Sequence, residues 1–295
     1  PPVWADLDRA AKLFARLTAT EVVMIAGASD YITEDSPWKT YPWQSWVHML
    51  SDKHCMNVQL GNINTSVHGC SYYAPTEGKP YLEDARPDKE SEYQILLGYT
   101  GDDNHMPADL SELSEKGFDY IALGHIHRPE MIEPNRMAYA GALEPIDSND
   151  TGEHGFWVGE ITKAFGQVQF CPLRKCQYVH ETIQLSSQMT NMAVQTIVKN
   201  LLANRKPYEL YKIFLTGTLN ADTELDLDWI RNQEAVVDVI CSLRQDYDYD
   251  RLREENEQQL LGRFIAAMQS QGESEVYKKA LEIGVEALLS AKLDR

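Results

Sequence analysis

The stretch FDYIALGHIHRPE, residues 118–130, holds the most informative pattern in the chain. Its residues 120–123 form an apolar run with the length and composition of a buried strand. This run leads directly into Gly124, His125 and His127, and a glycine at that point lets the backbone turn closely. Two histidines two positions apart on such a turn can direct ring nitrogens at one metal ion. Taken alone, the pattern is more typical of histidines in a surface turn.

The segments before this stretch alternate between helix and strand patterns. Apolar residues at helical spacing predict an amphipathic helix at about 5–18. Short apolar runs at 22–25 and 95–99 predict two more buried strands, and 58–60 with 66–70 predict strands of a meander. Helices that alternate with buried strands indicate a layered α/β fold.

The helix and strand patterns continue to about residue 172, and the segments beyond residue 173 differ in character. A short helix is predicted at 109–116, ended by Gly117. The pattern then predicts successive antiparallel strands at 137–139, 156–158 and 168–170. Beyond these, the predicted strands are 178–184, 210–216 and 236–241, and the predicted helices are 188–203, 249–269 and 274–291. We therefore expect two domains, an α/β domain at 1–172 and an α+β domain at 173–295.

Composition sets limits on the class of protein. The chain has 295 residues, 43% of them hydrophobic, which is enough for a large buried core. We find no apolar stretch long enough for a membrane span and no signal-peptide pattern, so we expect a cytoplasmic protein with no membrane contact. The five cysteines have no zinc-site spacing and are expected to be reduced. A net charge of −18 means that any contact with nucleic acid must be local or supplied by a partner.

Several motifs together resemble the SbcD-like DNA-repair exonucleases of the calcineurin-like metallophosphoesterase superfamily. The stretch 118–130 resembles the last motif of that family, and 138–145 with 151–155 resemble its next strand and turn. Upstream, 23–31 resembles the strand that leads into a Gly-Asn-His-Asp loop, and 67–72 resembles a mid-domain strand. The resemblance implies a four-layer α/β/β/α sandwich followed by a C-terminal α+β capping domain. It extends over about 5–165, and more loosely beyond.

The resemblance also implies a pair of divalent metal ions, usually Mn²⁺, that hold the scissile phosphate and activate a water molecule. His125 and His127 match metal ligands of the last motif. Asp30 matches a residue that only orients a histidine, and Ala28 and Ser29 stand where the asparagine and that histidine are expected. Tyr99 stands where a further histidine ligand is expected.

Two further ligand motifs are expected before the first helix, and the sequence given starts at that helix. We therefore expect the chain to lack those N-terminal motifs. The substitutions at Ala28, Ser29 and Tyr99 fall on loops that converge on one site, which favours a site that is weak, rebuilt or inactive. Asp102 and His105, which follow Tyr99 closely, have a spacing suited to a metal ion and are possible substitute ligands. The alternative for this loop is a polar turn before the helix at 109–116.

Three functions remain open from the sequence. The first is a metal-dependent DNA exonuclease or phosphodiesterase in DNA end processing and repair. The second is a catalytically weak or inactive pseudonuclease subunit that scaffolds a complex with an SbcC-type SMC-like ATPase. The third is a phosphoesterase that acts on a small nucleotide. The resemblance also implies DNA as a partner and possible homodimers.

Two apolar groups have two interpretations each. The stripe on the predicted helix 274–291 packs on the chain's own core or docks on a partner. Trp38, Trp43 and Trp46 fill the gap between a helix and a sheet, form a dimer contact, or stack on unpaired bases.

Overall fold

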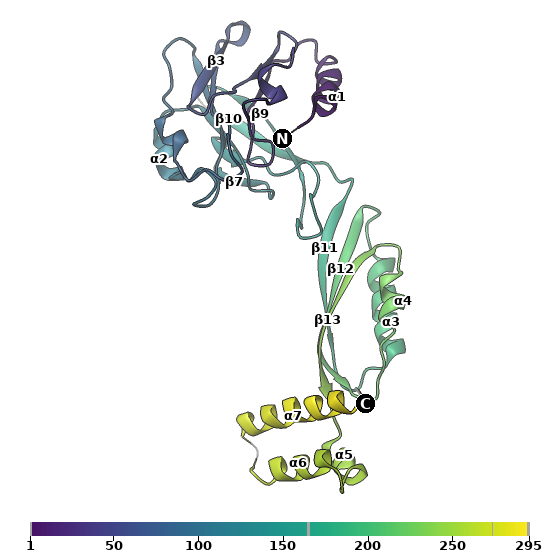
Figure 1. Cartoon of the computed structure of the whole chain (residues 1–295). Coiled ribbons are helices and arrows are strands. Elements are labelled where there is room, and N and C mark those ends of the chain that lie inside the picture. Colours follow the sequence, from purple (N-terminus) through teal and green to yellow (C-terminus); the bar gives the residue numbers. More distant parts are fainter. Residues whose placement is uncertain (1, 164–165, 273, 294–295) are drawn as a thin grey trace. The chain divides into compact units, whose positions relative to one another are not determined.

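The computed structural model of the chain describes residues 2–163, 166–272 and 274–293. They divide into two compact units, one comprising 1–179 with 206–210 and the other comprising 180–205 with 211–295. The first unit begins with helix α1 (Trp4–Phe14) and contains most of the strands (Figure 1). Each unit is a mixture of helices and strands, so the mixed α/β fold is confirmed. The four-layer arrangement and the capping role stay predictions.

A six-stranded sheet forms the centre of the first unit. Its strand order is β3-β4-β5-β6-β8-β7. The strands are β3 (Met56–Leu60), β4 (Thr65–Gly69), β5 (Tyr93–Tyr99), β6 (Tyr120–Gly124), β7 (Glu130–Glu133) and β8 (Met137–Tyr139). Strands β4, β5, β6 and β8 are parallel, and the edge strands β3 and β7 are antiparallel to their neighbours. The parallel strands therefore present their carboxyl ends along one edge of the sheet.

The core of this sheet consists of the apolar residues that mark its strands in the sequence. Leu96, Ile121 and Leu123 are almost fully buried, together with Phe118 in the turn before β6. Helix α2 (Leu110–Glu115) packs on this core through Leu113. The side chain of Asp109 caps its first turn by accepting hydrogen bonds from backbone N–H groups.

The remaining strands of the first unit form two small sheets. Strand β1 (Val22–Met24) pairs in parallel with β2 (Val47–Met49), and β9 (Gly155–Ile161) pairs in an antiparallel way with β10 (Gly166–Pro172). The strands predicted at 137–139, 156–158 and 168–170 are present, and the last two pair in an antiparallel way as predicted, but the first does not pair with them. Strand β8 joins the large sheet instead, because its short apolar run pairs in parallel with the buried β6.

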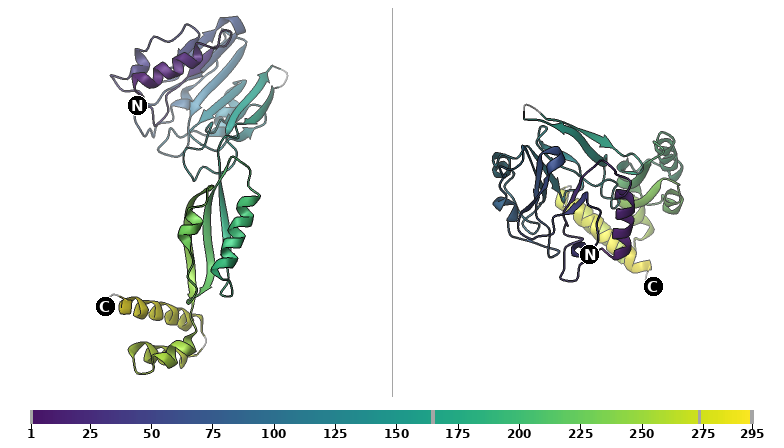
Figure 2. Two further views of the ribbon diagram at one scale, coloured as in Figure 1. Left: turned by 90° about the vertical axis from the view of Figure 1, so that its right-hand side faces the viewer. Right: turned by 90° about the horizontal axis from the view of Figure 1, so that it is seen from above.

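The second unit contains a three-stranded sheet in the order β11-β12-β13, flanked by helices. Its strands are β11 (Gln177–Leu185), β12 (Glu209–Asn220) and β13 (Val236–Asp246), and its first helices are α3 (Asn191–Ala203) and α4 (Leu227–Arg231). Figures 1 and 2 show α3 along one face of this sheet. Val194 and Val198 of α3 are fully buried, as are Ile213 and Leu215 of β12.

The last helices of the second unit differ from the prediction of one long helix at 249–269. The structure has α5 (Tyr249–Glu255) and α6 (Leu260–Gln269), followed by α7 (Glu275–Leu293). The break falls at Asn256, whose side chain bonds back to the carbonyl of Leu252 and is nearly buried. A Cβ atom at Gly262 would lie 2.3 Å from the Asn256 carbonyl oxygen, so the glycine allows this tight turn.

The apolar stripe on α7 packs mainly on the chain itself. Leu281 and Val285 are buried against Leu261 and Ile265 of α6, and Figure 2 shows the two helices side by side. Val276 and Ile283 remain exposed. The interpretation that the stripe packs on the chain's own core therefore holds for most of it.

All five cysteines are free thiols, as predicted. Within the described residues, no helix is both long and apolar enough to span a membrane.

We expect Phe118→Ala to lower the free energy of unfolding of the first unit by about 3–5 kcal/mol. Phe118 is 1% exposed and meets the ring of His68 edge-on at 5.3 Å, so its removal leaves a cavity in the main core. Ile63→Ala is the control, because Ile63 is 53% exposed and its loss should change stability by less than about 0.5 kcal/mol. Chemical denaturation followed by circular dichroism measures both, and equal effects would contradict this account of the core.

Candidate metal centre

The candidate site lies at the carboxyl ends of β5 and β6. In the parallel register Tyr99 pairs with Gly124, so the segments after both strands leave the sheet side by side. The loop after β5 carries Asp102 and His105, and the turn after β6 carries His125 and His127. Ligands in parallel sheets are usually bound at this edge.

Asp102, His105 and His125 form one cluster of candidate ligands. Their ligand atoms all lie within 4.8 Å of one another. Asp102 Oδ1 is 2.7 Å from His105 Nδ1, and the rings of His105 and His125 stack with centroids 4.4 Å apart. An ionised carboxylate only accepts hydrogen bonds, so His105 donates from Nδ1 and its Nε2 remains the basic nitrogen.

Glycine makes this cluster possible. A Cβ atom at Gly101 would lie 1.8 Å from Cδ2 of His125, so any other residue there would displace the ring. His125 itself has φ of +96°, a backbone conformation that residues with a side chain rarely adopt. Such backbone strain is concentrated at functional sites, where surrounding structure compensates for its cost.

The protonation states of the cluster suit a divalent cation. Burial lowers the pKa of His125, and the neighbouring His105 lowers it further, so the neutral imidazole is favoured. The hydrogen bond from His105 lowers the pKa of Asp102 and keeps the carboxylate ionised. Two imidazoles and one carboxylate are a donor set for Mn²⁺, Fe²⁺ or Zn²⁺. Donors that share one ion lie roughly 3–4 Å apart, so the three residues fit one ion after a small adjustment.

Tyr99 lies between this cluster and the loop that follows β1. Its hydroxyl is 3.3 Å from Nδ1 of His125, and a Cβ atom at Gly27 would lie 2.6 Å from its Cε2 atom. The ring also meets Tyr72 edge-on at 4.9 Å. Burial raises the pKa of the Tyr99 hydroxyl, which stays protonated. The space between the two loops is therefore filled by an aromatic ring.

Asp30 does not belong to the cluster. Its Oδ1 accepts a hydrogen bond of 2.7 Å from the backbone N–H of Gly27, and its carbonyl accepts one of 2.9 Å from the indole of Trp38. Burial raises the pKa of its carboxyl group. Asp30 thus closes its own loop, Ala28 packs against the main core and Ser29 is exposed. The assignment of Asp30 as an orienting residue stays a prediction.

His127 faces a different partner from His125. Its Nδ1 lies 3.0 Å from Oδ2 of Asp150, which also accepts a hydrogen bond of 2.9 Å from the backbone of Ile146. Burial raises the pKa of Asp150, but the hydrogen bonds from Ile146 and His127 outweigh this and lower it. His154 is 5% exposed, and its Nε2 has no hydrogen-bond partner among the described residues.

The sequence analysis therefore identified three of the residues that meet here, His125, Asp102 and His105. It did not single out Asp150, which contacts His127 across 23 positions of the sequence. His127 is not part of the described cluster, and its role as a ligand stays a prediction.

The aromatic residues Trp38 and Trp43 stack on each other at 6.1 Å, and Phe14 of α1 meets Trp43 at 6.0 Å. They fill the gap beside α1, as the simpler interpretation predicted.

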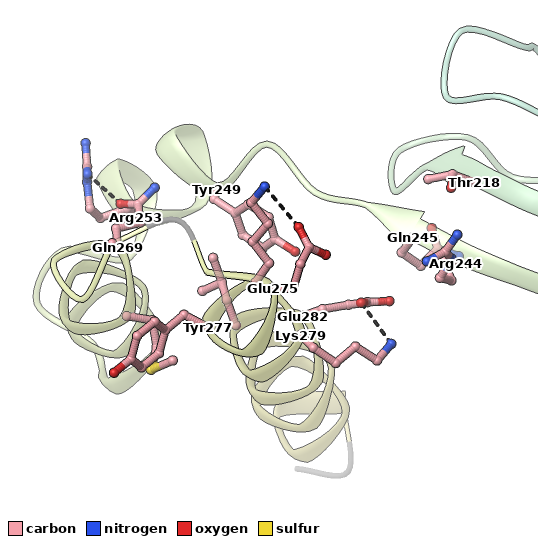
Figure 3. Close-up of a pocket in the computed structure, with 14 residues that line it drawn as sticks. Thr218, Arg244, Gln245, Tyr249, Arg253, Gln269, Glu275, Tyr277, Lys279 and Glu282 are labelled. Atoms are coloured by element: carbon pink, nitrogen blue, oxygen red, sulfur yellow. Dashed lines mark hydrogen bonds and ion pairs between the residues drawn. The ribbon is translucent and has the colours of Figure 1, made fainter.

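A cavity of about 850 Å³ lies in the second unit, between the ends of β12 and β13 and the helices α5 to α7 (Figure 3). Its charged side chains mostly bond to one another. Lys279 pairs with Glu282 at 2.9 Å, and Arg253 bonds to Gln269 at 2.7 Å. This lining shows no group of candidate metal ligands among the described residues.

In this mixed α/β fold, imidazole and carboxylate side chains lie at the ends of parallel strands, where they could hold a divalent metal ion. The chain is 26% identical over 164 residues to the uncharacterised metallophosphoesterase YhaO of Bacillus subtilis, a match to 51% of this chain and 40% of that protein. It is 33% identical over 66 residues to the SbcD component of the nuclease SbcCD of Rhodobacter capsulatus, over 22% of this chain and 15% of that protein. No protein-family model matches the chain.

These matches support the metallophosphoesterase superfamily for this chain. The matched segments span less than half the length of either relative. The cluster of Asp102, His105 and His125 at the ends of β5 and β6 is a group of side chains in the described residues that could hold a metal ion.

We expect the chain to bind Mn²⁺ through this cluster, and Asp102→Asn and His105→Ala should each weaken binding by at least about 10-fold. Asp103→Asn is the matched control, because it makes the same change one residue away and outside the cluster. Calorimetry on the full-length protein measures the affinities. His127→Ala distinguishes this cluster from the alternative pair of His125 and His127. We expect His127→Ala to weaken Mn²⁺ binding less than His105→Ala does, and the reverse order would favour the pair.

Proposed function

We propose that this chain is a DNA-end-processing subunit on a metallophosphoesterase fold, with a hydrolytic site that is reduced to a single metal ion. It would act in DNA repair as a scaffold with weak or no phosphodiesterase activity. The observation that carries the proposal is Tyr99, whose ring fills the space between the Gly27 loop and His125. A second ion in that space would require the ring to leave.

In the proposed site, one group of residues binds a metal ion and a second group lacks the side chains needed for hydrolysis. An ion held by Asp102, His105 and His125 would polarise a phosphoryl oxygen. Tyr99 is protonated and hydrogen-bonded to His125, so it is not a base that activates water. Ala28 and Ser29 supply neither an amide nor an imidazole to a leaving group. The site can therefore bind a phosphate through its ion more readily than it can cleave one.

DNA as the substrate is supported by the match to a protein named as part of a nuclease. An active SbcD-like exonuclease with Mn²⁺ is the second candidate function, favoured by the retention of both His125 and His127. Measurement of Mn²⁺ content together with nuclease activity separates the two candidates. One ion with little hydrolysis fits the proposal, and two ions with processive hydrolysis fit the exonuclease.

Restoring the expected motif should reopen the site. We expect Ala28→Asn, Ser29→His and Tyr99→His together, in the full-length protein, to raise Mn²⁺ affinity by about 10-fold, equivalent to about 1.4 kcal/mol. The physical reason is that two imidazoles and an amide replace a methyl group, a hydroxyl and a buried ring. Tyr99→Phe is the control, because it removes only the hydroxyl and restores no ligand. No gain in the triple variant would count against a site of this family's geometry.

The proposal includes an SbcC-type SMC-like ATPase as the partner, in line with the name of the Rhodobacter relative, which marks it as one component of a nuclease complex. It also treats 1–172 as the phosphoesterase domain and 173–295 as a capping and DNA-binding domain. The exposed residues Val276 and Ile283 of α7 are seven positions apart and so lie on the same side of the helix. They form an apolar surface on which a partner helix could pack.

We expect Ile283→Asp to weaken binding of such an ATPase by about 10-fold or more, since a carboxylate would have to be buried in the interface. Met192→Asp is the matched control, because Met192 is also exposed but lies on α3. Co-purification of the two full-length proteins, followed by calorimetry, measures the effect. Equal affinities for the two variants would place the interface elsewhere.

A further inference from the structure

We infer that a cavity beside the His127–Asp150 pair binds a single nucleotide of a DNA strand, with its phosphate on Arg128 and its base on Trp157 and Phe170. The cavity has a volume of about 500 Å³ and is also lined by Pro129 and Thr151. This volume lies in the usual range for sites that bind small molecules. The inference rests on the proposed function, because that function names DNA as the ligand.

The cavity adjoins the candidate metal site along two loops. Arg128 directly follows His127, and Thr151 directly follows Asp150. His127 and Asp150 are joined by a contact of 3.0 Å, so this pair holds the two loops together at the edge of the cavity. A strand whose phosphate reaches the turn after β6 would therefore place the neighbouring nucleotide in reach of Arg128.

Arg128 supplies the charge that a phosphate needs. It is exposed and makes no hydrogen bond or ion pair with the other described residues. Glu153, the acidic residue of the lining, is held by Arg174 at 3.1 Å. The whole chain carries a net charge of −18, which repels DNA, so a free guanidinium is the local source of attraction. Guanidinium groups bind phosphate through two parallel hydrogen bonds.

Trp157 and Phe170 supply a rigid aromatic surface. They are directly opposite each other on β9 and β10, with ring centroids 5.2 Å apart. The indole N–H of Trp157 donates to the carbonyl of Tyr139 at 3.0 Å, which fixes the ring plane. Both side chains are half-buried, so each keeps part of its surface open. Bases of single strands stack on such rings whatever their sequence.

A neighbouring cavity gives a useful contrast. It also borders Trp157, has a volume of about 320 Å³ and is lined by alanine, glycine and larger apolar residues, among them Phe156 and Ile161. Its lining contains no charged side chain among the described residues. Of these two cavities, the one at Arg128 therefore combines a free cation with aromatic rings, which are the two groups that a nucleotide requires.

The test is fluorescence anisotropy of a labelled oligothymidylate of about ten nucleotides, with the full-length protein in EDTA. We expect Arg128→Gln and Phe170→Leu each to weaken binding by about 10-fold. Arg16→Gln is the control for charge, because Arg16 is exposed on the chain after α1 and does not line the cavity. Phe156→Leu is the control for the aromatic change, because Phe156 precedes Trp157 on β9 and so points to the opposite face.

An abasic strand of the same length and charge separates the two contacts. Binding of that strand should still depend on Arg128, whereas Phe170→Leu should leave it unchanged. The inference is overturned if both variants bind the oligothymidylate as the wild type does, or if Arg16→Gln weakens binding as much as Arg128→Gln. Because EDTA removes metal ions, the test does not depend on Mn²⁺ binding or hydrolysis, so failure of the proposed metal site and failure of this cavity are distinguishable.

Discussion

The site depends on the parallel pairing of β5 with β6. This pairing sets Tyr99 opposite Gly124, and the two loops that follow then leave the sheet at the same edge. A shift of one residue would turn the buried faces of both strands outward, so the apolar side chains of Leu96, Ile121 and Leu123 hold the register. The close approach of Gly101 to the His125 ring is a direct consequence of that register.

Tyr99 makes this edge of the sheet aromatic. Its ring meets the ring of Tyr72 on one side and that of His125 on the other, with centroid distances of 4.9 and 5.2 Å. A histidine at the same position would expose a nitrogen for an ion and would lose part of this packing. In this chain the position therefore contributes aromatic packing rather than an imidazole.

Much of the fold could be predicted from the sequence because its central strands are continuous apolar runs. The strands at 95–99 and 120–123 were found for this reason, and the helix at 109–116 was found from the glycine that ends it. Strands β2 and β7 were missed, since they are short and only partly buried. The break between α5 and α6 depends on a turn at Asn256, and the helical pattern on either side gives no sign of it.

The candidate site was predictable where its residues are close in sequence and unpredictable where they meet through the fold. His125 could be recognised from its turn, and Asp102 with His105 from their spacing. That His105 stacks on His125 follows from the register of two strands, which no local pattern contains. The pairing of His127 with Asp150 spans 23 positions and depends on a loop that has no regular structure.

The geometry of the cluster of Asp102, His105 and His125 depends on the loop after β5. This loop holds itself together, because the backbone of Gly101 bonds to the His105 carbonyl and the backbone of His105 bonds to the Asp102 carbonyl, each at 2.9 Å. The hydroxyl of Thr100 donates a hydrogen bond of 2.6 Å to the carbonyl of Met106, and both residues are buried, so the loop is attached to the core. Two of the three residues of the cluster thus come from one turn, and only His125 comes from the segment after another strand. This cluster needs only two loops to converge, and the loop at Ala28 and Ser29 is not part of it.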